Sequence, residues 1–243
     1  MVYSTNIDGE RVEFGTSGML YRSNKLMYDR RTNTLWNQFT GVPAAGPLAG
    51  SEARLELLPV VTTTWGEWFN AHPDTTVLDV ETGLYPGRFY ESEWNDRSIY
   101  FSYRESPTTM FPVWQTSDEL ATKNHVIGLN IGHQARAYPL ETLRKERVIN
   151  DELGGLPLVM VTTGHLGSRA YERGERTFLL EEGDAPDSSV ITDSEGQTWR
   201  VEENALVNLE NPSQLLPRIP SHNAYWFGWY SFYPGTDVYR SGE

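Results

Sequence analysis

The spacing of apolar residues along the chain predicts many short strands and a few short helices. Residues 156–161 form an apolar run typical of a central strand, and residues 55–59 alternate like a half-buried strand. Between them, the pattern predicts strands at 126–131, 135–140 and 148–151 and a short helix at 141–146. We therefore expect a β-rich α+β fold of mixed and antiparallel strands.

The first 28 residues are predicted to form strands joined by tight turns. Asp8-Gly9 is a hairpin signal between segments 1–4 and 11–14. The run Gly15–Gly18 is expected to interrupt the next strand, which resumes at Met19. Ser17 lies in this run, but a nucleophile elbow needs Gly-x-Ser-x-Gly followed by a helix. The second glycine here comes one residue early and no helix pattern follows, which favours a turn residue.

A short aromatic helix is expected from Trp65 to Ala71. Thr64 and Glu67 have the spacing of a capping box at its start, and Pro73 ends it. Trp65, Trp68 and His72 then lie on one helix face. Such a face is either a platform for a sugar or another flat ligand, or a packing surface that pins the helix to a sheet.

The pattern around this helix occurs twice. Trp226, Trp229, Pro234, Thr236 and Val238 repeat the spacing of the earlier Trp, Trp, Pro, Thr and Val. Tyr233 stands in the place of His72, and this retention of bulk without the imidazole favours packing. Two further motifs recur: Gly9–Phe14 is similar to Gly174–Phe178, and Asp29…Trp36 is similar to Asp193…Trp199. We therefore expect two related tandem halves, each with a short Trp-bearing helix.

The two halves are predicted to be unequal. The first repeat spans residues 1–78, a connecting insertion spans 79–124, and the second repeat spans 125–243. Both repeats contain the motif Gly-Glu-Arg, at residues 9–11 and 174–176. About fifty residues of the second repeat precede its motif, whereas eight residues precede the motif of the first. The simplest interpretation is that the first repeat lacks its front half. Within the insertion, Glu91, Glu93 and Asp96 have no EF-hand spacing, so a solvated loop is favoured over a cation site.

Composition excludes several classes of partner and site. The chain of 243 residues has a net charge of −13 with 17 Arg and 3 Lys, and no basic stripe, which argues against nucleic acid and anionic lipid. It has no Cys, so it forms no disulfide, thiolate nucleophile or zinc–thiolate site. No apolar run reaches the ~18–20 residues of a membrane span, and no signal peptide is visible.

Several motifs together resemble one known family. They are Phe14-Gly-Thr-Ser-Gly-Met-Leu-Tyr21, Met27-Tyr-Asp-Arg-x-Thr-x-x-Leu35-Trp36, Ala45-Gly-Pro-Leu-Ala-Gly50, Thr64-Trp-x-x-Trp68 with His72-Pro-Asp-Thr75, and Ala135-Arg-Ala-Tyr-Pro-Leu140. This combination resembles the bacterial and archaeal domain-of-unknown-function family 3179 over nearly the whole chain. The family brings no established reaction with it.

The resemblance implies more than the residues themselves show. Full-length members typically begin with a secretory or lipoprotein signal, a block like residues 125–161, and a Cys-Pro-x-Cys-type motif, in which some members carry selenocysteine. This implies an extracytoplasmic protein, and the chain would then be a possible selenoprotein fragment that starts just after the motif. The corresponding place in the second repeat is Thr162–Ser168. There His165 is either a ligand or proton carrier, or a hydrogen-bonded loop residue.

Two functions from different classes are predicted. The first is the scaffold of a redox or soft-metal-handling protein whose Cys or selenocysteine motif lies upstream. The alternative is a cell-envelope module that binds a small ligand or sugar, or is structural, without catalysis. The partner is expected to be an unidentified small molecule or envelope protein, and no catalytic residue, cofactor or metal is assigned. Candidate ligand-binding residues are Ser17, Asp29, Arg30, Trp36, Trp65, Trp68, His72, His165, Trp226 and Trp229. Among these, Asp29 is also placed to accept backbone N–H groups in a turn.

Overall fold

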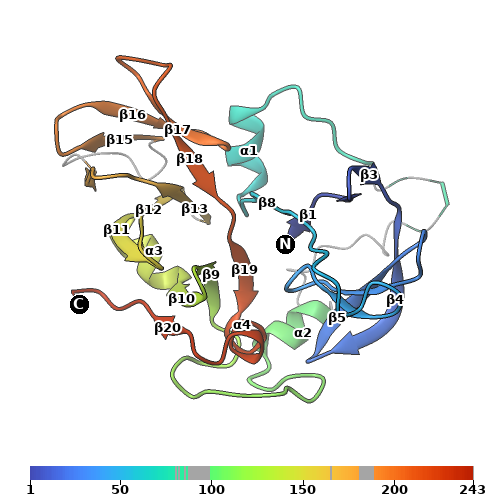
Figure 1. The fold of residues 1–243 in the computed structure, drawn as a ribbon. Helices are drawn as coiled ribbons and strands as arrows, with labels where there is room; N and C mark the ends of the chain where they lie inside the picture. Colours follow the sequence, from blue (N-terminus) through green and yellow to red (C-terminus); the bar gives the residue numbers. More distant parts are fainter. Residues whose placement is uncertain are drawn as a thin grey trace.

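The computed structural model describes residues 1–79, 81, 83, 84, 86, 99–164, 166–180 and 189–242. Over these residues the structure is β-rich, with 40% in strands and 12% in helices, of which four short ones are described. In Figure 1 the earlier residues form the right-hand side and the later residues the left-hand side, while α1 stands between them. The predicted β-rich α+β class is therefore confirmed.

The largest sheet belongs to the later residues. Its eight strands run in the order β11-β12-β13-β18-β17-β16-β15-β14, and every neighbouring pair is antiparallel. The strands are β11 Val148–Leu153, β12 Leu156–Thr163, β13 Gly167–Glu172, β14 Phe178–Leu179, β15 Val190–Asp193, β16 Thr198–Val201, β17 Ala205–Asn208 and β18 Leu215–Ile219.

A second sheet supports the helix α4. Its order is β19-β9-β10-β20, and its one parallel pair joins β10 to β20. The elements are β9 His125–Ile131, β10 Gln134–Pro139, α3 Leu140–Glu146, β19 His222–Tyr225, α4 Trp226–Phe232 and β20 Asp237–Val238. Trp229 of α4 lies directly over Gly128 of β9, where a Cβ atom would enter the indole ring. A glycine at this position therefore lets α4 approach the sheet closely.

The earlier residues form smaller sheets. One has the order β4-β5-β6-β7, and the pairs β1-β8 and β2-β3 are separate. The elements are β1 Val2–Tyr3, β2 Asn6–Ile7, β3 Glu10–Arg11, β4 Phe14–Tyr21, β5 Asn24–Asp29, β6 Leu35–Asn37, β7 Pro43–Ala45, β8 Leu57–Leu58, α1 Trp65–Ala71 and α2 Ile99–Glu105. The helix α2 lies within the segment predicted as an insertion.

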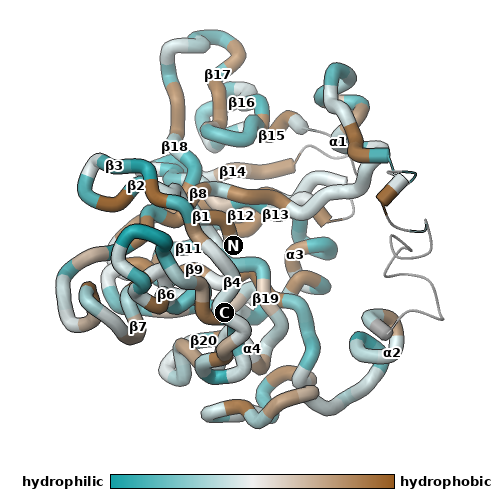
Figure 2. The backbone as a smooth tube through the Cα atoms, turned by 90° about the vertical axis from the view of Figure 1, so that its right-hand side faces the viewer, coloured by the Kyte–Doolittle hydropathy of each residue, from teal (hydrophilic) through white to brown (hydrophobic). Residues whose placement is uncertain are grey.

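Two of the buried clusters lie on opposite faces of β12 and β13. Leu158 and Met160 enter one buried cluster, whereas Val159 and Val161 enter another on the opposite face. Successive side chains of a strand point to opposite faces, so a strand covered on both sides needs a continuous apolar run. Figure 2 shows the hydrophobic stretch of β12 in brown. The apolar pattern of 156–161 therefore predicted a central strand correctly.

Two expectations for the start of the chain are wrong. Asp8-Gly9 does turn a hairpin, but it joins β2 to β3, while β1 pairs with β8. The run Gly15–Gly18 does not break the strand, because β4 continues to Tyr21 through a register shift between Thr16 and Leu20. A bulge absorbs the irregular residues without ending the pairing. Across the described ranges, none of the helices has the length and hydropathy to cross a bilayer.

Candidate functional site

The helix α1 has the predicted bounds, Trp65–Ala71. The Thr64 hydroxyl accepts from Glu67 N at 3.2 Å, and the Glu67 carboxylate accepts from Thr64 N at 3.1 Å. This capping box satisfies two backbone donors that a helix start leaves unpaired. The Glu67 carboxylate also accepts a hydrogen bond from the Thr63 hydroxyl at 2.7 Å, which fixes its position further. The sequence therefore sets the position and direction of α1 locally.

Two aromatic rings, one in α1 and one at its C-terminal cap, lie together toward the later residues. The Trp68 and His72 ring centroids are 4.1 Å apart, and the Trp68 indole donates to the Thr75 hydroxyl at 2.9 Å. Trp65 instead packs on Phe69, with 5.3 Å between ring centroids, and remains 53% exposed. Trp65 therefore contacts a different ring from the one that Trp68 and His72 share.

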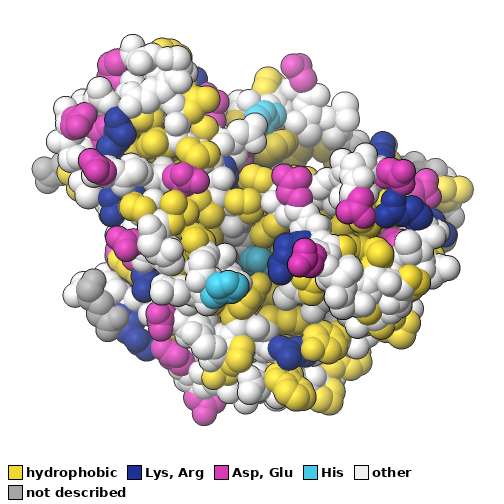
Figure 3. Space-filling view, in the orientation of Figure 1, with side chains coloured by type: hydrophobic (Ala, Val, Ile, Leu, Met, Phe, Trp, Pro, Cys, Tyr) yellow, Lys and Arg dark blue, Asp and Glu magenta, His cyan; other side chains and the backbone are white. Residues whose placement is uncertain are grey.

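A cavity of about 640 Å³ lies between α1 and the large sheet. Its lining combines Trp68 and His72 with residues from the end of β12, from β13 and from the β16–β17 hairpin. The turn at Gly164 touches Glu67 so closely that a Cβ atom would collide with its carboxylate. The surface is indented between α1 and the part that carries β15–β18 (Figure 3). The volume is within the ~300–1,000 Å³ of small-molecule sites.

An arginine–glutamate pair forms a fixed polar part of this cavity. Arg169, only 8% exposed, donates from Nε and Nη2 to Glu203 Oε1 at 3.1 and 2.5 Å. Its Nη1 donates to the Thr163 hydroxyl and to the Gly167 carbonyl, both at 2.9 Å. The guanidinium is therefore held on three sides, and a planar fork held in this way is a rigid recognition surface.

Arg218 lies behind this pair. Its Nη1 is 3.6 Å from Glu203 Oε2, and its guanidinium is 5.3 Å from the centre of the Tyr171 ring. Burial lowers the pKa of Arg218 and raises the pKa of Tyr171 to about 12. Two guanidiniums thus share the Glu203 carboxylate, so its orientation toward the cavity is constrained from both sides.

A second arginine–glutamate pair also lines the cavity. Arg200 lies 2.6 Å from Glu202, and both line the cavity. The site therefore presents donors and acceptors side by side, together with an indole and an imidazole. Such a surface suits a ligand that both donates and accepts hydrogen bonds.

Other predicted site residues lie outside this cavity. Ser17 lies in β4, and its hydroxyl donates to the Leu26 carbonyl at 2.6 Å. The buried Asp29 accepts from Thr32 N at 2.5 Å and from the Trp36 indole at 2.9 Å. Burial raises the pKa of Asp29, but these hydrogen bonds outweigh it and hold the pKa below its usual value. Arg30 is exposed and lies 3.9 Å from Glu13.

The second Trp pair is part of the core. Trp226 and Trp229 are 1% and 0% exposed. The Trp229 indole donates to the Thr236 hydroxyl at 2.9 Å, the same contact that Trp68 makes with Thr75. His165 lies outside the described residues, as do Glu91, Glu93 and Asp96.

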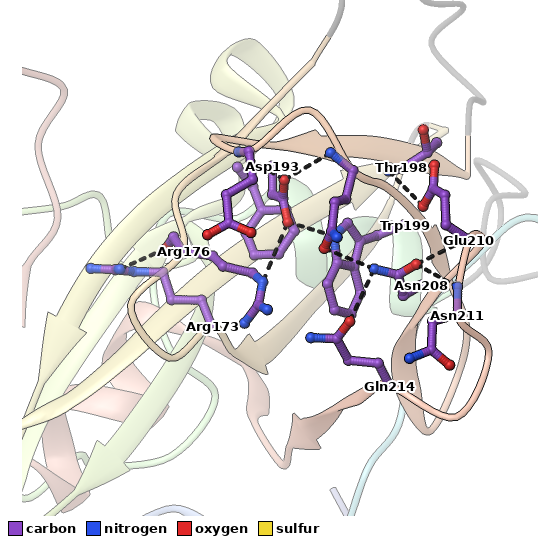
Figure 4. Close-up of polar contacts among 12 residues, drawn as sticks. Arg173, Arg176, Asp193, Thr198, Trp199, Asn208, Glu210, Asn211 and Gln214 are labelled. Carbon is purple, nitrogen blue, oxygen red and sulfur yellow. Dashed lines mark hydrogen bonds and ion pairs between the residues drawn. The ribbon is translucent and has the colours of Figure 1, made fainter.

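The buried Asp–Trp contact also occurs twice. Asp193 accepts from the Trp199 indole at 2.9 Å, as Asp29 does from Trp36. Figure 4 shows the Asp193 carboxylate between the indole and the Arg176 guanidinium, which lies 3.3 Å away. Each carboxylate also accepts backbone N–H groups from its own turn. These contacts make both aspartates structural, the role that the turn pattern indicates for Asp29.

Sequence reasoning missed the polar half of the cavity. Thr163, Arg169 and Glu203 belong to no motif, and Arg169 and Glu203 are 34 residues apart. The sequence did point to Thr163, which lies in the segment 162–168 of the second repeat that corresponds to the Cys-Pro-x-Cys-type motif of the family. Within the described ranges, no group of three or more His, Asp and Glu side chains is placed to hold a metal ion.

The fold and this cavity define a β-rich α+β protein with a polar site between its earlier and later residues. The family model described as a protein of unknown function (DUF3179) matches residues 1–236. The chain therefore belongs to this family, which confirms the resemblance found in the sequence. No curated protein and no solved structure matches the chain.

Proposed function

We propose that the cavity beside α1 binds a small, uncharged, polyhydroxylated ligand of the size of a sugar. The observation that carries this proposal is the pairing of two aromatic rings, Trp68 and His72, with the fixed Arg169–Glu203 pair in one cavity of about 640 Å³. Sugars offer apolar ring faces together with hydroxyls that donate and accept.

The charge balance argues for an uncharged ligand. Arg169 is held by Glu203 and Arg200 by Glu202, so the cationic groups of the cavity already have anionic partners. A ligand carboxylate or phosphate would have to compete with these pairs, whereas neighbouring hydroxyls bridge them. The Glu203 side chain remains 36% exposed and is the accessible acceptor of the pair.

The proposal corresponds to the cell-envelope binding module expected from the sequence. An extracytoplasmic location and an envelope partner remain predictions. The redox or soft-metal scaffold also remains a prediction, and it is tested by assaying a Cys-containing full-length protein for thiol–disulfide exchange. Thiol–disulfide activity in that protein would favour the scaffold.

We also propose that the chain consists of two related halves joined by residues 79–124. The support is local geometry. The helices α1 and α4 each have seven residues, and their caps His72 and Tyr233 have φ/ψ of −135°/70° and −127°/68°. The ring pairs Trp68–His72 and Trp229–Tyr233 are 4.1 and 4.3 Å apart. That the first half lacks a front block remains a prediction.

A ligand screen tests the proposed site. Thermal unfolding is followed with glucose, galactose, N-acetylglucosamine, maltose and cellobiose at millimolar concentration, and binding is then measured by calorimetry. At least one sugar is expected to raise the Tm, since a ligand that binds only the folded state stabilises it.

Matched variants locate the binding. Trp68→Leu is expected to weaken binding about tenfold, the loss of one stacked ring. Trp65→Leu, on the same helix but outside the cavity, is the control and is expected to leave the affinity unchanged. If no sugar binds, or if Trp65→Leu weakens binding as much as Trp68→Leu does, the proposal is wrong.

A further inference from the structure

A second cavity, of about 630 Å³, lies at the tip of the β4–β5 hairpin. It is lined by residues 20–23 of the hairpin and by residues 111–114. None of these residues lines the cavity beside α1. The second cavity is therefore a separate site, and a ligand bound there is independent of the sugar-sized ligand proposed above.

Exposed apolar side chains gather at the second cavity. Leu20, Tyr21, Phe111 and Trp114 line it, and all four are exposed. Hydrophobic side chains also gather at the lower edge of the face shown in Figure 3, near the end of β4. Single exposed apolar residues are ordinary, whereas a group of them around one cavity indicates a binding surface.

The hairpin tip holds Arg22 in an unfavourable backbone conformation. Arg22 and Ser23 connect β4 to β5, with φ of 50° and 63°. Two positive φ angles suit the tight turn of a hairpin, but Asn and Gly are the residues that usually adopt them. Such strain costs free energy and persists mostly at functional sites. The turn therefore makes Arg22 a candidate binding residue.

Three aromatic rings contact the Arg22 guanidinium. Its Cζ atom lies 5.3 Å from the centre of the Tyr21 ring, 5.2 Å from that of Trp114 and 5.7 Å from that of Phe232. These distances are typical of cation–π contacts. The rings are thus already in contact with a cation of the protein itself, which disfavours a cationic ligand at the same place.

One edge of the guanidinium is left for a ligand. Nη1 donates to the Ser231 carbonyl near the end of α4 at 3.0 Å. Within the described part of the chain, Arg22 has no carboxylate partner, and its Nε and Nη2 groups donate no hydrogen bond. The N–H groups of Nε and Nη2 are parallel, and such a pair binds both oxygens of one carboxylate.

We propose that the second cavity binds an amphipathic carboxylate of the fatty-acid type. The carboxylate pairs with the Nε–Nη2 edge of Arg22, and the alkyl chain lies on the exposed apolar side chains that line the cavity. Charge decides between the possible occupants. A neutral apolar molecule leaves the guanidinium without a partner, and an apolar cation is repelled by it.

Probes that share an alkyl chain but differ in their head group test the proposal. Octanoate, octanol and octyltrimethylammonium form such a set, and acetate carries the carboxylate without the chain. Calorimetry and thermal unfolding of the whole protein are expected to show that octanoate binds most tightly. Acetate is expected not to bind, because binding needs the apolar contact as well as the charge. Failure of octanoate to bind, or equally tight binding of octanol or of the ammonium, would overturn the proposal.

Matched substitutions place the carboxylate. Arg22→Gln is expected to weaken octanoate binding about tenfold, the loss of one charge-assisted contact. Arg30→Gln removes the same charge just beyond the other end of β5, from an exposed residue outside the cavity, and is expected to leave the affinity unchanged. Equal effects of the two substitutions would assign the binding to general surface charge and contradict the proposal.

A second variant covers the case in which Arg22→Gln disturbs the hairpin. Trp114→Ala removes an exposed ring and is expected to weaken the binding of octanoate by about as much as that of octanol, because it removes apolar surface and no charge. Circular dichroism checks that all three variants are folded. Unchanged octanoate binding in Trp114→Ala would show that the ligand lies elsewhere.

Discussion

The helices α1 and α4 carry the same Trp-x-x-Trp spacing but lie in different surroundings. In α4 both indoles are almost fully buried, over β9 and beside Phe39. In α1 the corresponding Trp65 is 53% exposed, and no residue of the helix is buried. The segment after α4 pairs with β10 as β20, whereas Val77, at the corresponding place after α1, is 67% exposed.

The contrast shows that the local sequence determines where each helix forms and which contacts it makes within itself. The elements packed around the helix determine how deeply it is buried. Both helices keep the indole-to-threonine hydrogen bond at 2.9 Å, with or without a covering sheet. Burial adds stability in proportion to the apolar area removed from water. We therefore interpret α4 as a stabilising element and α1 as an accessible face that borders the first cavity.

The largest expected effect is on α4. Trp229→Ala is expected to lower the free energy of unfolding by about 4 kcal/mol, because it leaves a large cavity over Gly128. Trp68→Ala is expected to cost only about 1 kcal/mol, since Trp68 is only half-buried. Urea denaturation of both variants measures the difference. Equal losses would show that the two helices are equally packed.

A buried histidine near α4 is expected to make stability depend on pH. His222 bonds to the Phe39 carbonyl at 2.9 Å, and burial lowers its pKa to about 4. The unfolded chain takes up this proton first, near pH 6.5, so the folded state loses stability as the pH falls. The free energy of unfolding is expected to fall by about 3 kcal/mol between about pH 6.5 and pH 4.

The control for this prediction is His222→Gln, which keeps a donor for the Phe39 carbonyl but does not titrate. Urea denaturation across this pH range is expected to show a smaller pH dependence for the variant. An identical pH dependence in both proteins would assign the effect to other groups.

The two Asp–Trp pairs test the proposed relation between the halves. Asp29→Ala and Asp193→Ala each leave a buried indole N–H without its acceptor, and each is expected to cost about 2 kcal/mol. Asp193→Ala is expected to cost more, because Arg176 also loses its partner. Denaturation midpoints compare the two. A large loss at one site and none at the other would argue against equivalent roles.

The smallest expected difference concerns the two threonines that accept from the indoles. Thr236→Val is expected to lower the free energy of unfolding by about 1 kcal/mol, because water cannot replace the hydroxyl beside the buried Trp229. Thr75→Val is expected to cost less, since water reaches the half-buried Trp68. Thermal unfolding resolves the order, and a larger loss for Thr75→Val would contradict this interpretation of the comparison.

Local signals predicted the fold better than the site. The capping residues Thr64 and Glu67 predicted the start of α1 and Pro73 predicted its end, because each acts on the helix terminus next to it. The strand break predicted from Gly15 and Gly18 was wrong, because β4 continues to pair with β5 through a bulge. Arg169 and Glu203 meet only through the sheet order, which no local pattern encodes. The aromatic half of the cavity was therefore predictable and its polar half was not.

The most direct test of the account follows the indole N–H signals of Trp68 and Trp229 by NMR during titration with the sugars of the screen. The two groups make the same hydrogen bond, but only Trp68 lines the cavity. We predict that a bound sugar shifts the Trp68 signal and leaves the Trp229 signal in place. Equal shifts of both signals, or no shift of the Trp68 signal with any sugar, would contradict the account.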